Sequence, residues 1–155
     1  MSDEVKVRLA VPSDAPILAE FNTIMAKETE GVELDRGTLA GGLAALFEKP
    51  QYGFYVVAEV SGQIAGGLMI TYEWTDWRNG VIWWVQSVYV RPAYRRRGIY
   101  TRLYSFVKEL AAREGNVRGF RLYVEKENFV AQKTYQAAGM IEARYKVFEE
   151  MPPRV

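Results

Sequence analysis

Two residue types that carry much of enzyme chemistry are missing from this chain of 155 residues, which contains no cysteine and no histidine. The lack of cysteine excludes disulfides and thiolate nucleophiles, and it suits a reducing cytoplasm. The lack of histidine excludes a Ser-His-Asp triad, a Cys-His pair and a histidine metal site, so no metal is predicted. Any proton transfer must therefore use aspartate, glutamate, tyrosine, lysine or water.

Long apolar runs and an excess of one charge are also lacking. The apolar stretches fall short of a membrane span, and the acidic, polar start MSDEVKVRLA shows no signal peptide. We therefore expect a cytoplasmic protein that does not enter a membrane. The formal net charge is +1, which gives no overall attraction to nucleic acid, so nucleic acid is not an expected partner. The sequence does not set the oligomeric state and is compatible with a homodimer.

Hydrophobic periodicity predicts alternating strands and helices in a single domain over residues 1–155. Strands are expected at residues 5–9, 52–60, 64–72, 81–90, 117–124 and 145–150. Helices are expected at residues 12–25, 39–47, 99–115 and 128–138, with a loop at residues 30–37. This order, β-α-α-β-β-β-α-β-α-β, predicts an α/β fold with a central, mixed, twisted sheet flanked by about four helices.

The strongest local signal is a basic loop between the strand at residues 81–90 and the following helix. The segment VYVRPAYRRRGI at residues 88–99 passes from an apolar strand through three consecutive arginines, residues 95–97, and Gly98 into that helix. The first amides of a helix lack an intrahelical partner, and the helix dipole adds positive potential. Glycine allows a close approach of the backbone, and arginines donate charge-assisted hydrogen bonds. The loop therefore predicts an anion site suited to pyrophosphate, with a solvated basic turn as the alternative.

Two motifs resemble the GNAT superfamily of N-acetyltransferases. RRRGIY at residues 95–100 is similar to the family's Gln/Arg-x-x-Gly-x-Gly/Ala, with Tyr100 in place of the last small residue. NFVAQKTYQAAGM at residues 128–140 resembles the family's Asn-x-x-Ala-x-x-x-Tyr-x-x-x-Gly-Phe, with Met140 in place of Phe. The predicted order of elements fits the same family across nearly the whole chain.

This resemblance implies a GNAT-like fold and acetyl-CoA as a cosubstrate. The implied reaction moves the acetyl group to a primary amine by direct attack within a ternary complex. The strand at residues 86–90 is then expected to bulge and to splay from its neighbour, so that its backbone binds the pantetheine arm. The implied cofactor-binding residues are Val88, Tyr89, Val90, Arg95, Arg96, Arg97, Gly98, Ile99, Tyr100, Thr101 and Asn128, of which Asn128 is also expected to cap the last helix.

The resemblance also assigns the proton transfers. It makes Tyr135 the acid that protonates the departing thiolate, whereas without the surrounding motif a tyrosine there would be a core residue of an amphipathic helix. The positions that hold a glutamate base in different family members correspond here to Trp84 and Gln86, and neither side chain can act as a base. A backbone N–H at the bulge, that of Val88, is the expected donor to the developing oxyanion.

The base must therefore come from elsewhere. Glu73 is the predicted base, ahead of Asp76 and Glu28, because it is the nearest carboxylate at the end of the preceding strand. A solvated carboxylate at a strand end is the structural alternative for Glu73. A water chain that carries the proton to bulk solvent is an equal alternative for the reaction.

The acceptor is predicted to be a small cationic amine. In the family, the first two helices and the loop between them help to form the acceptor site, and residues 28–35 hold four acidic residues that would attract a cation. Tryptophans can bind an amine through cation–π contacts, although Trp83 is expected in the core. The predicted substrate-binding residues are Glu28, Glu30, Trp74, Asp76 and Trp84. The layout of residues 72–80 also resembles the diamine and polyamine acetyltransferase branch.

Three other functions remain open. A protein or peptide N-acetyltransferase would need an open groove. A non-catalytic acyl-CoA-binding sensor is suggested by the missing carboxylate at Trp84 and Gln86. A nucleic-acid-binding protein would use the arginine run, but the near-neutral total charge and the single short basic cluster argue against it.

Overall fold

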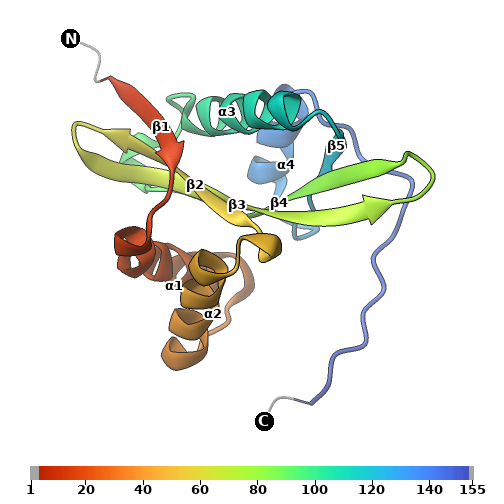
Figure 1. The fold of residues 1–155 in the computed structure, drawn as a ribbon. Coiled ribbons are helices and arrows are strands. Elements are labelled where there is room, and N and C mark those ends of the chain that lie inside the picture. The colour runs from red at the N-terminus through yellow and green to blue at the C-terminus, as the bar shows by residue number, and fades with distance from the viewer. Residues whose placement is uncertain (1–3, 154–155) are drawn as a thin grey trace. The chain divides into compact units, whose positions relative to one another are not determined.

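A five-stranded mixed sheet organises the first 121 residues of the computed structural model, which describes residues 4–153 (Figure 1). The strand order is β1-β2-β3-β4-β5, in which β1 to β4 are antiparallel neighbours and β5 runs parallel to β4. The strands are β1 Val5–Leu9, β2 Phe54–Val60, β3 Gln63–Thr75, β4 Gly80–Val90 and β5 Val117–Arg121. The predicted α/β class with a mixed sheet is confirmed.

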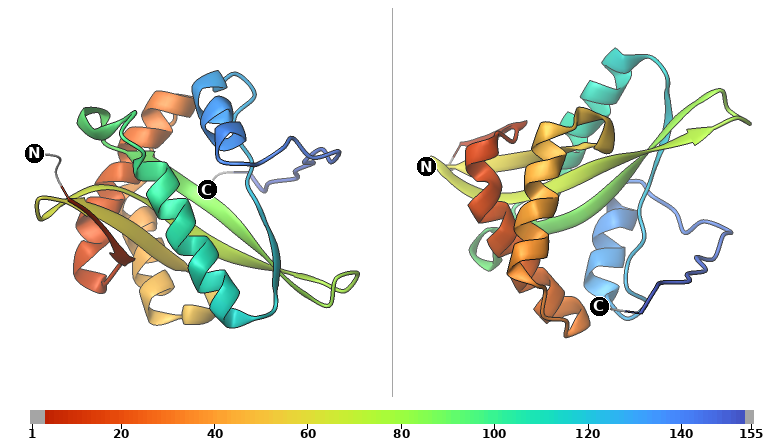
Figure 2. Two further views of the ribbon diagram at one scale, coloured as in Figure 1. Left: turned by 90° about the horizontal axis from the view of Figure 1, so that it is seen from above. Right: turned by 60° about the horizontal axis from the view of Figure 1, so that its bottom comes forward.

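Two compact units make up the chain, Met1–Glu125 and Lys126–Val155. In the first unit, the described residues 4–125 form the sheet and three helices, α1 Ala15–Glu30, α2 Arg36–Glu48 and α3 Ile99–Glu114. It also holds three short 3-10 turns, η1 Pro12–Asp14, η2 Pro50–Tyr52 and η3 Pro92–Tyr94. Within this unit α1 and α2 cover one face of the sheet and α3 covers the other (Figures 1 and 2).

The connection between α1 and α2 is shorter than the sequence predicts. The first helix continues to Glu30 and ends at Gly31, whose φ of 65° is left-handed. The second helix begins directly after Asp35, because the Asp35 carboxylate accepts a hydrogen bond from the Thr38 N–H at 2.9 Å and so caps the helix. The connection is therefore residues 31–35 rather than 30–37, and Glu28 and Glu30 lie on the last turn of α1.

The buried side chains form a core on both sides of the sheet. Beneath α1 and α2 the core consists of Leu18, Phe21, Leu43, Leu46, Tyr55, Val57, Ile64 and Tyr89. Trp83 is 5% exposed and packs edge-on against Phe54 and Phe120, with ring centroids 5.3 Å and 6.4 Å away. The prediction that Trp83 is a core residue is confirmed.

The sheet is irregular on both sides of the second half of β4. Toward β3, Met69 pairs with Gln86 but Gly67 pairs with Tyr89, so β4 carries one extra residue there. Ser87 lies at this bulge with a left-handed φ of 52°. Toward β5, the pairing runs from Val81 to Trp84 and goes no further along β4. The predicted bulge and the predicted splay of residues 86–90 are both present.

Between residues 126 and 153, the described part of the second unit, the chain forms one helix, α4 Phe129–Ala137. Asn128 caps it, because its side-chain oxygen accepts a hydrogen bond from the Ala131 N–H at 3.2 Å. Gly139 follows the helix with a left-handed φ of 103°, as the sequence predicts.

Two strand predictions near the C-terminus need correction. The strand expected at Tyr145–Glu150 is wrong, since residues 141–153 form neither helix nor strand. A strand requires a partner ladder as well as suitable residues, and β propensity alone does not supply one: Phe148 is 92% exposed. The fifth strand ends at Arg121 rather than at residue 124, close to the point where β4 and β5 diverge.

Candidate active site

The basic loop after β4 is fixed to the sheet where it begins. The Arg91 N–H donates to the Ala65 carbonyl at 2.8 Å, and its Nε donates to the Ile64 carbonyl at 2.8 Å. The Arg91 guanidinium also lies 5.0 Å from the centre of the Phe21 ring. Arg91 therefore ties the start of the loop to β3 and α1, and η3 then leads into the arginine run.

The backbone of the loop has the form of an anion cradle. Arg96 and Gly98 both have left-handed φ, at 64° and 74°. Left-handed residues alternating with ordinary ones turn successive N–H groups toward a common concavity. The helix that follows makes its first backbone bond from the Arg102 N–H to the Gly98 carbonyl at 3.0 Å, so the amides before it have no helical partner. The loop and the entrance of α3 thus meet the geometric requirement for a pyrophosphate site.

Gly98 serves this loop through its conformation and its open surroundings. A Cβ placed on Gly98 would meet no atom within 4 Å, so no protein atom crowds this position. Its positive φ is the feature that another residue would adopt only with strain. The predicted close approach of a ligand to this backbone is therefore sterically free.

The three arginines have different surroundings. Arg95 donates from Nε to the Val90 carbonyl at 2.8 Å, and its Nη2 lies 3.5 Å from the Glu28 carboxylate. Arg97 lies over the Tyr94 ring at 5.8 Å, and Arg96 is exposed. Arg95 is thus used to brace the loop, while Arg96 and Arg97 are the arginines best placed to meet a bound phosphate.

Tyr100, which replaces the small residue of the family motif, does not fill the loop. Its side chain is 6% exposed and stacks on Tyr104 at 5.8 Å with an interplanar angle of 13°. The ring is therefore part of the packing of α3, and the substitution leaves the open space at Gly98 intact.

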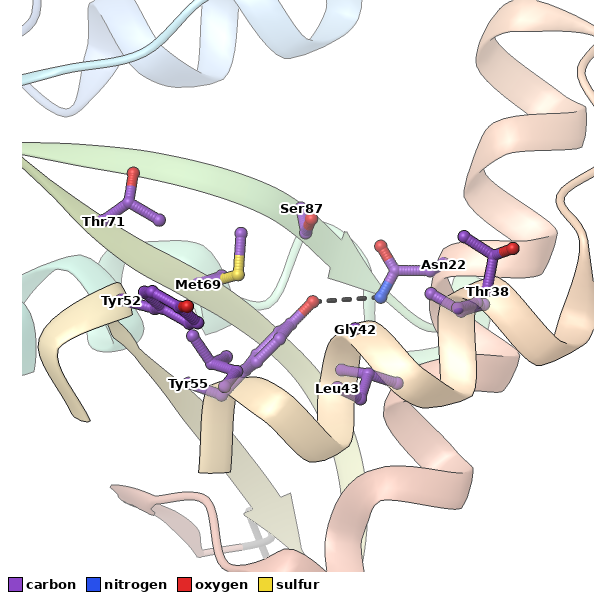
Figure 3. Close-up of a pocket in the computed structure, with 11 residues that line it drawn as sticks. Asn22, Thr38, Gly42, Leu43, Tyr52, Tyr55, Met69, Thr71 and Ser87 are labelled. Atoms are coloured by element: carbon purple, nitrogen blue, oxygen red, sulfur yellow. Dashed lines mark hydrogen bonds between the residues drawn. The ribbon is translucent and has the colours of Figure 1, made fainter. Parts of the chain in front are cut away.

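A pocket of about 400 Å³ lies between α1, α2 and the sheet (Figure 3). Its walls come from both helices, from η2 and from three strands, including the bulge of β4. The residues that line it are Asn22, Thr38, Leu39, Gly42, Leu43, Leu46, Tyr52, Tyr55, Met69, Thr71 and Ser87. Every one of these side chains is uncharged near neutral pH, and five of them are aliphatic or thioether side chains or glycine.

A hydrogen-bonded chain connects the wall of the pocket to the bulge. The Asn22 Nδ2 donates to the Leu18 carbonyl and to the Tyr55 hydroxyl, both at 2.9 Å, and Figure 3 shows the second of these bonds. Burial raises the pKa of Tyr55, while hydrogen bonds to Asn22 and to the Ser87 side chain act in the opposite direction. Tyr55 therefore stays a neutral phenol that links α1 to Ser87, where β4 bulges.

A polar row continues along the same face of β3. Alternate residues of a strand share a face, so Met69 and Thr71, which line the pocket, share theirs with Glu73. The Gln86 Nε2 donates to the Thr71 Oγ1 at 2.6 Å. Glu73 accepts hydrogen bonds at one oxygen from the Trp84 Nε1 at 2.8 Å and from the Arg121 Nη1 at 3.1 Å. The predicted base thus lies on the pocket side of the sheet, two residues beyond the pocket lining.

The predicted substrate-binding residues do not line this pocket. Glu28 pairs with Arg95 beside the basic loop, and Glu30 is exposed at the end of α1. Trp74 is 62% exposed, and Asp76 lies in the exposed turn between β3 and β4. Trp84 makes its polar contact with Glu73. None of these five residues therefore lines the pocket between α1, α2 and the sheet.

The residues that sequence reasoning missed are the pocket lining itself. Two signals pointed to it. Asn22 interrupts the apolar face of α1, one turn after the buried Leu18. Gln86 and Ser87 form a polar pair inside the otherwise apolar strand β4. Polar residues that break a local pattern in this way are typical of functional sites.

The second unit holds the predicted acid. Tyr135 lies in the helix that Asn128 caps, and burial raises its pKa to about 12. The phenol is therefore protonated at neutral pH, which is the state that an acid needs before it donates.

A membrane-spanning helix and a carboxylate metal site are both absent from the described residues. Over residues 4–153 no helix combines the length and the apolarity needed to cross a membrane. In the same range, Asp and Glu side chains form no group of three or more with the arrangement of a metal site.

The chain resembles proteins of known structure and family. The model of the Acetyltransferase (GNAT) family matches residues 18–140. A possible acetyltransferase from Clostridium difficile 630 is 42% identical, with 97% of this chain and 99% of that chain covered and a TM-score of 0.88. A comparison with curated proteins gave no match.

Two more distant structures share the fold. A predicted acetyltransferase from Clostridium acetobutylicum, solved with acetyl-CoA, is 18% identical with 95% and 96% coverage and a TM-score of 0.77. An aminoglycoside N-acetyltransferase in complex with CoA is 16% identical with 97% coverage of both chains and a TM-score of 0.77. The family match over most of the sequence, the 42% identical relative and the shared fold lead to one conclusion: this chain belongs to the GNAT family of acetyltransferases.

Proposed function

We propose that this acetyltransferase moves the acetyl group of acetyl-CoA to the primary amine of a small molecule, by direct attack within a ternary complex. The observation that carries the proposal is the position of the β4 bulge. The loop at residues 95–98 follows the bulged segment along the chain, and the neutral pocket reaches the bulge at Ser87. A strand that leads to an anion cradle at one end and borders a cavity at the bulge can bring two substrates together.

The cosubstrate is proposed from the fit of the loop. Left-handed φ at Arg96 and Gly98, the open space at Gly98, and the exposed Arg96 and Arg97 suit a diphosphate. Two structures with the same fold hold CoA or acetyl-CoA, which supports the same ligand here. Acetyl-CoA supplies the acetyl thioester when bound.

The bulge is proposed to align that thioester with the acceptor. Beyond Trp84 the β4 backbone is no longer paired with β5, so its outward groups can bind an extended pantetheine arm as a neighbouring strand would. The N–H of Val88, in the bulge, is the proposed donor to the carbonyl oxygen where negative charge develops. The residues 88–90 and 95–101 are thus proposed to bind the cosubstrate.

Proton transfers are proposed for Glu73 and Tyr135. An alkylamine is almost entirely protonated at neutral pH, so it must lose a proton before it attacks. Glu73 is the proposed base because it lies on the pocket face of β3, and water molecules leading to bulk solvent remain the alternative. Tyr135 is the proposed acid because its phenol holds its proton across the neutral range.

The acceptor is proposed to be a small amine that arrives as a cation, drawn by the acidic residues that follow Lys27. A small-molecule acceptor agrees with the pocket volume of about 400 Å³ and with the aminoglycoside acceptors named for one structural relative. A cytoplasmic location and a homodimer remain predictions.

Release of free CoA thiol from acetyl-CoA in the presence of a panel of primary amines tests this function. The proposal expects amine-dependent thiol release with one acetylamide formed per thiol. Acetyl-CoA binding without thiol release for any amine would contradict it and would favour a sensor.

A further inference from the structure

The lining of the pocket between α1, α2 and the sheet contains no charged side chain, and this limits the acceptors that it can bind. None of the eleven lining residues is Asp, Glu, Lys or Arg. The carboxylates that were expected to bind a cation lie outside the pocket lining: Glu28 pairs with Arg95, and Glu30 and Asp76 are exposed. A ligand group that enters the pocket therefore meets hydroxyls, one carboxamide and apolar surface, but no counter-ion.

We propose that this pocket is the acceptor site, that it selects a primary monoamine with a neutral and largely apolar body, and that Gly42 sets the size of that body. This inference rests on the proposed acetyl transfer and names its substrate class. The reacting amine lies at the bulge of β4 near Ser87, and the rest of the acceptor extends between α2 and the sheet.

The first argument is electrostatic. A second ammonium group buried in this pocket would lose its hydration and find no carboxylate in return, which is costly in a medium of low polarity. An apolar body instead gains by contact with the aliphatic side chains of Leu39, Leu43 and Leu46. The pocket thus disfavours diamines and polyamines, and it favours aryl-alkyl or branched alkyl monoamines.

The second argument concerns orientation. Both hydrogens of the Asn22 Nδ2 are used, one by Leu18 and one by Tyr55, so the Asn22 oxygen is the group left for an acceptor to meet. Figure 3 shows this oxygen turned away from the Tyr55 hydroxyl. A donor on the acceptor, such as its amine, can therefore be held beside the bulge while the apolar body lies against α2.

The third argument concerns size. Gly42 lines the pocket from α2, and a Cβ placed on it would meet no atom within 4 Å. A larger side chain there would extend into the cavity without disturbing the helix. A volume of about 400 Å³ lies toward the small end of the range for ligand pockets, so a few added carbon atoms matter.

Gly41 provides a matched control. It is the neighbour of Gly42 on α2, it is also exposed, and a Cβ on it also meets nothing within 4 Å, but it does not line the pocket. Replacing either glycine by leucine changes the intrinsic helix preference equally. A difference between Gly42→Leu and Gly41→Leu therefore reports the occupancy of the pocket.

The experiment measures kcat/KM by thiol release for four amines: 2-phenylethylamine, ethylamine, 1,4-diaminobutane and spermidine. For the natural chain we expect kcat/KM for 2-phenylethylamine to exceed that for either polyamine at least tenfold. In Gly42→Leu we expect KM for 2-phenylethylamine to rise at least tenfold, with KM for ethylamine and for acetyl-CoA changed less than twofold. Gly41→Leu should resemble the natural chain for all four amines.

The outcomes separate this inference from the proposed function. Faster turnover of spermidine or 1,4-diaminobutane, or equal KM values in the two leucine variants, would overturn the inference and leave acetyl transfer standing. No thiol release with any amine would overturn the proposed function. In that case calorimetric titration of 2-phenylethylamine into the acetyl-CoA-bound protein tests whether the pocket binds the monoamine, independently of acetyl transfer. Binding to the natural chain that is lost in Gly42→Leu would support the inference. No binding to the natural chain would overturn the inference.

Discussion

The basic loop and the proposed acceptor pocket are built in opposite ways. The loop is a continuous stretch, residues 91–98, and it acts through its main chain, held by left-handed residues and by the bonds of Arg91 to β3. The pocket is assembled from α1, α2, η2, β2, β3 and β4, and it acts through side chains that are neutral. A feature shared by a family can therefore reside in backbone geometry, while the proposed selection of the acceptor resides in side chains from separate parts of the chain.

Removal of the proposed acid should have the largest effect on the rate. It should lower kcat without changing binding at either the loop or the pocket. Tyr135→Phe is expected to lower kcat by ~10²–10⁴, the usual contribution of a general acid. The dissociation constant of acetyl-CoA and KM of the acceptor should change little, since neither the loop nor the pocket lining contains Tyr135. Tyr145→Phe, in the same unit, is the control and should leave kcat unchanged. An unaltered kcat in Tyr135→Phe would remove this residue from the mechanism.

The pH dependence of kcat sharpens the same assignment. Because burial raises the pKa of Tyr135 to about 12, the phenol keeps its proton at every pH below about 10. The rate should therefore not fall between neutral pH and pH 10 through loss of this acid. A decline in kcat over that range that is present in the natural chain and absent from Tyr135→Phe would show that its folded-state pKa is lower than this.

The affinity for acetyl-CoA should depend on the charges of the loop and on the salt concentration, whereas binding in the pocket should depend on neither. Arg96→Ala with Arg97→Ala is expected to raise the dissociation constant of acetyl-CoA at least tenfold, about 1.4 kcal/mol, because two charge-assisted donors are lost. Added salt should reduce the difference in acetyl-CoA affinity between this double variant and the natural chain. Arg113→Ala, at the other end of α3, is the control. Calorimetric titrations at two ionic strengths that give equal affinities for all three proteins would mean that the loop does not bind the phosphates.

The pocket should respond to the loss of one hydroxyl. Tyr55→Phe removes the hydroxyl that bonds both Asn22 and Ser87, and if the freed Asn22 weakens acceptor binding by the net value of a single hydrogen bond, about 0.5–1.5 kcal/mol, acceptor KM rises two- to tenfold. The affinity for acetyl-CoA should stay the same. Tyr104→Phe, on the α3 face of the sheet, should change neither constant. An effect of Tyr55→Phe on acetyl-CoA affinity alone would contradict the separation of the two regions.

A variant remote from both regions should affect stability without affecting either affinity. Arg8 donates to both oxygens of Asp14, at 2.8 Å and 3.0 Å, and these bonds lower the pKa of the buried Asp14 carboxyl. Its contribution is present above the unfolded pKa, near 3.9, and is lost as the pH falls through the lower folded pKa. Asp14→Asn should cost about 1.5–3 kcal/mol at neutral pH.

Thermal unfolding at two pH values checks this contribution. The difference in melting temperature between Asp14→Asn and the natural chain should be large at neutral pH and should shrink below about pH 4. Affinities for acetyl-CoA and acceptor should match the natural chain. A difference that grows toward acid pH would show that the sign of the Asp14 contribution is wrong.

The loop was predictable from sequence because its evidence is local. An apolar strand, three consecutive arginines, a glycine and an amphipathic helix stand in order, and the structure places them in that order, with Gly98 in a left-handed conformation. The bulge of β4 was implied by the family resemblance, and it is present at Ser87. The capping of α4 by Asn128 was predictable for the same reason, since a cap is set by residues three apart.

The pocket was not predictable because its residues meet only in the folded chain. Asn22 and Tyr55 are 33 positions apart, and no spacing rule joins them. The position of Trp74 was also not predictable, because the sequence does not fix how far the β3–β4 hairpin extends: β3 continues to Thr75, and Trp74 is 62% exposed near the hairpin end. The strand prediction at residues 145–150 was wrong because the residue pattern gives a preference for extended backbone but does not supply a neighbouring strand to pair with.

Backbone amide resonances followed by NMR during titration with acetyl-CoA test the central claim most directly, since that claim concerns main-chain N–H groups. The account predicts that the largest shifts fall on Arg97, Gly98 and Ile99, while the amides of Leu43 and Leu46 in the pocket wall move little. A later addition of the monoamine should shift the pocket residues. Large shifts elsewhere in the chain, with residues 96–101 unmoved at saturating acetyl-CoA, would contradict the account.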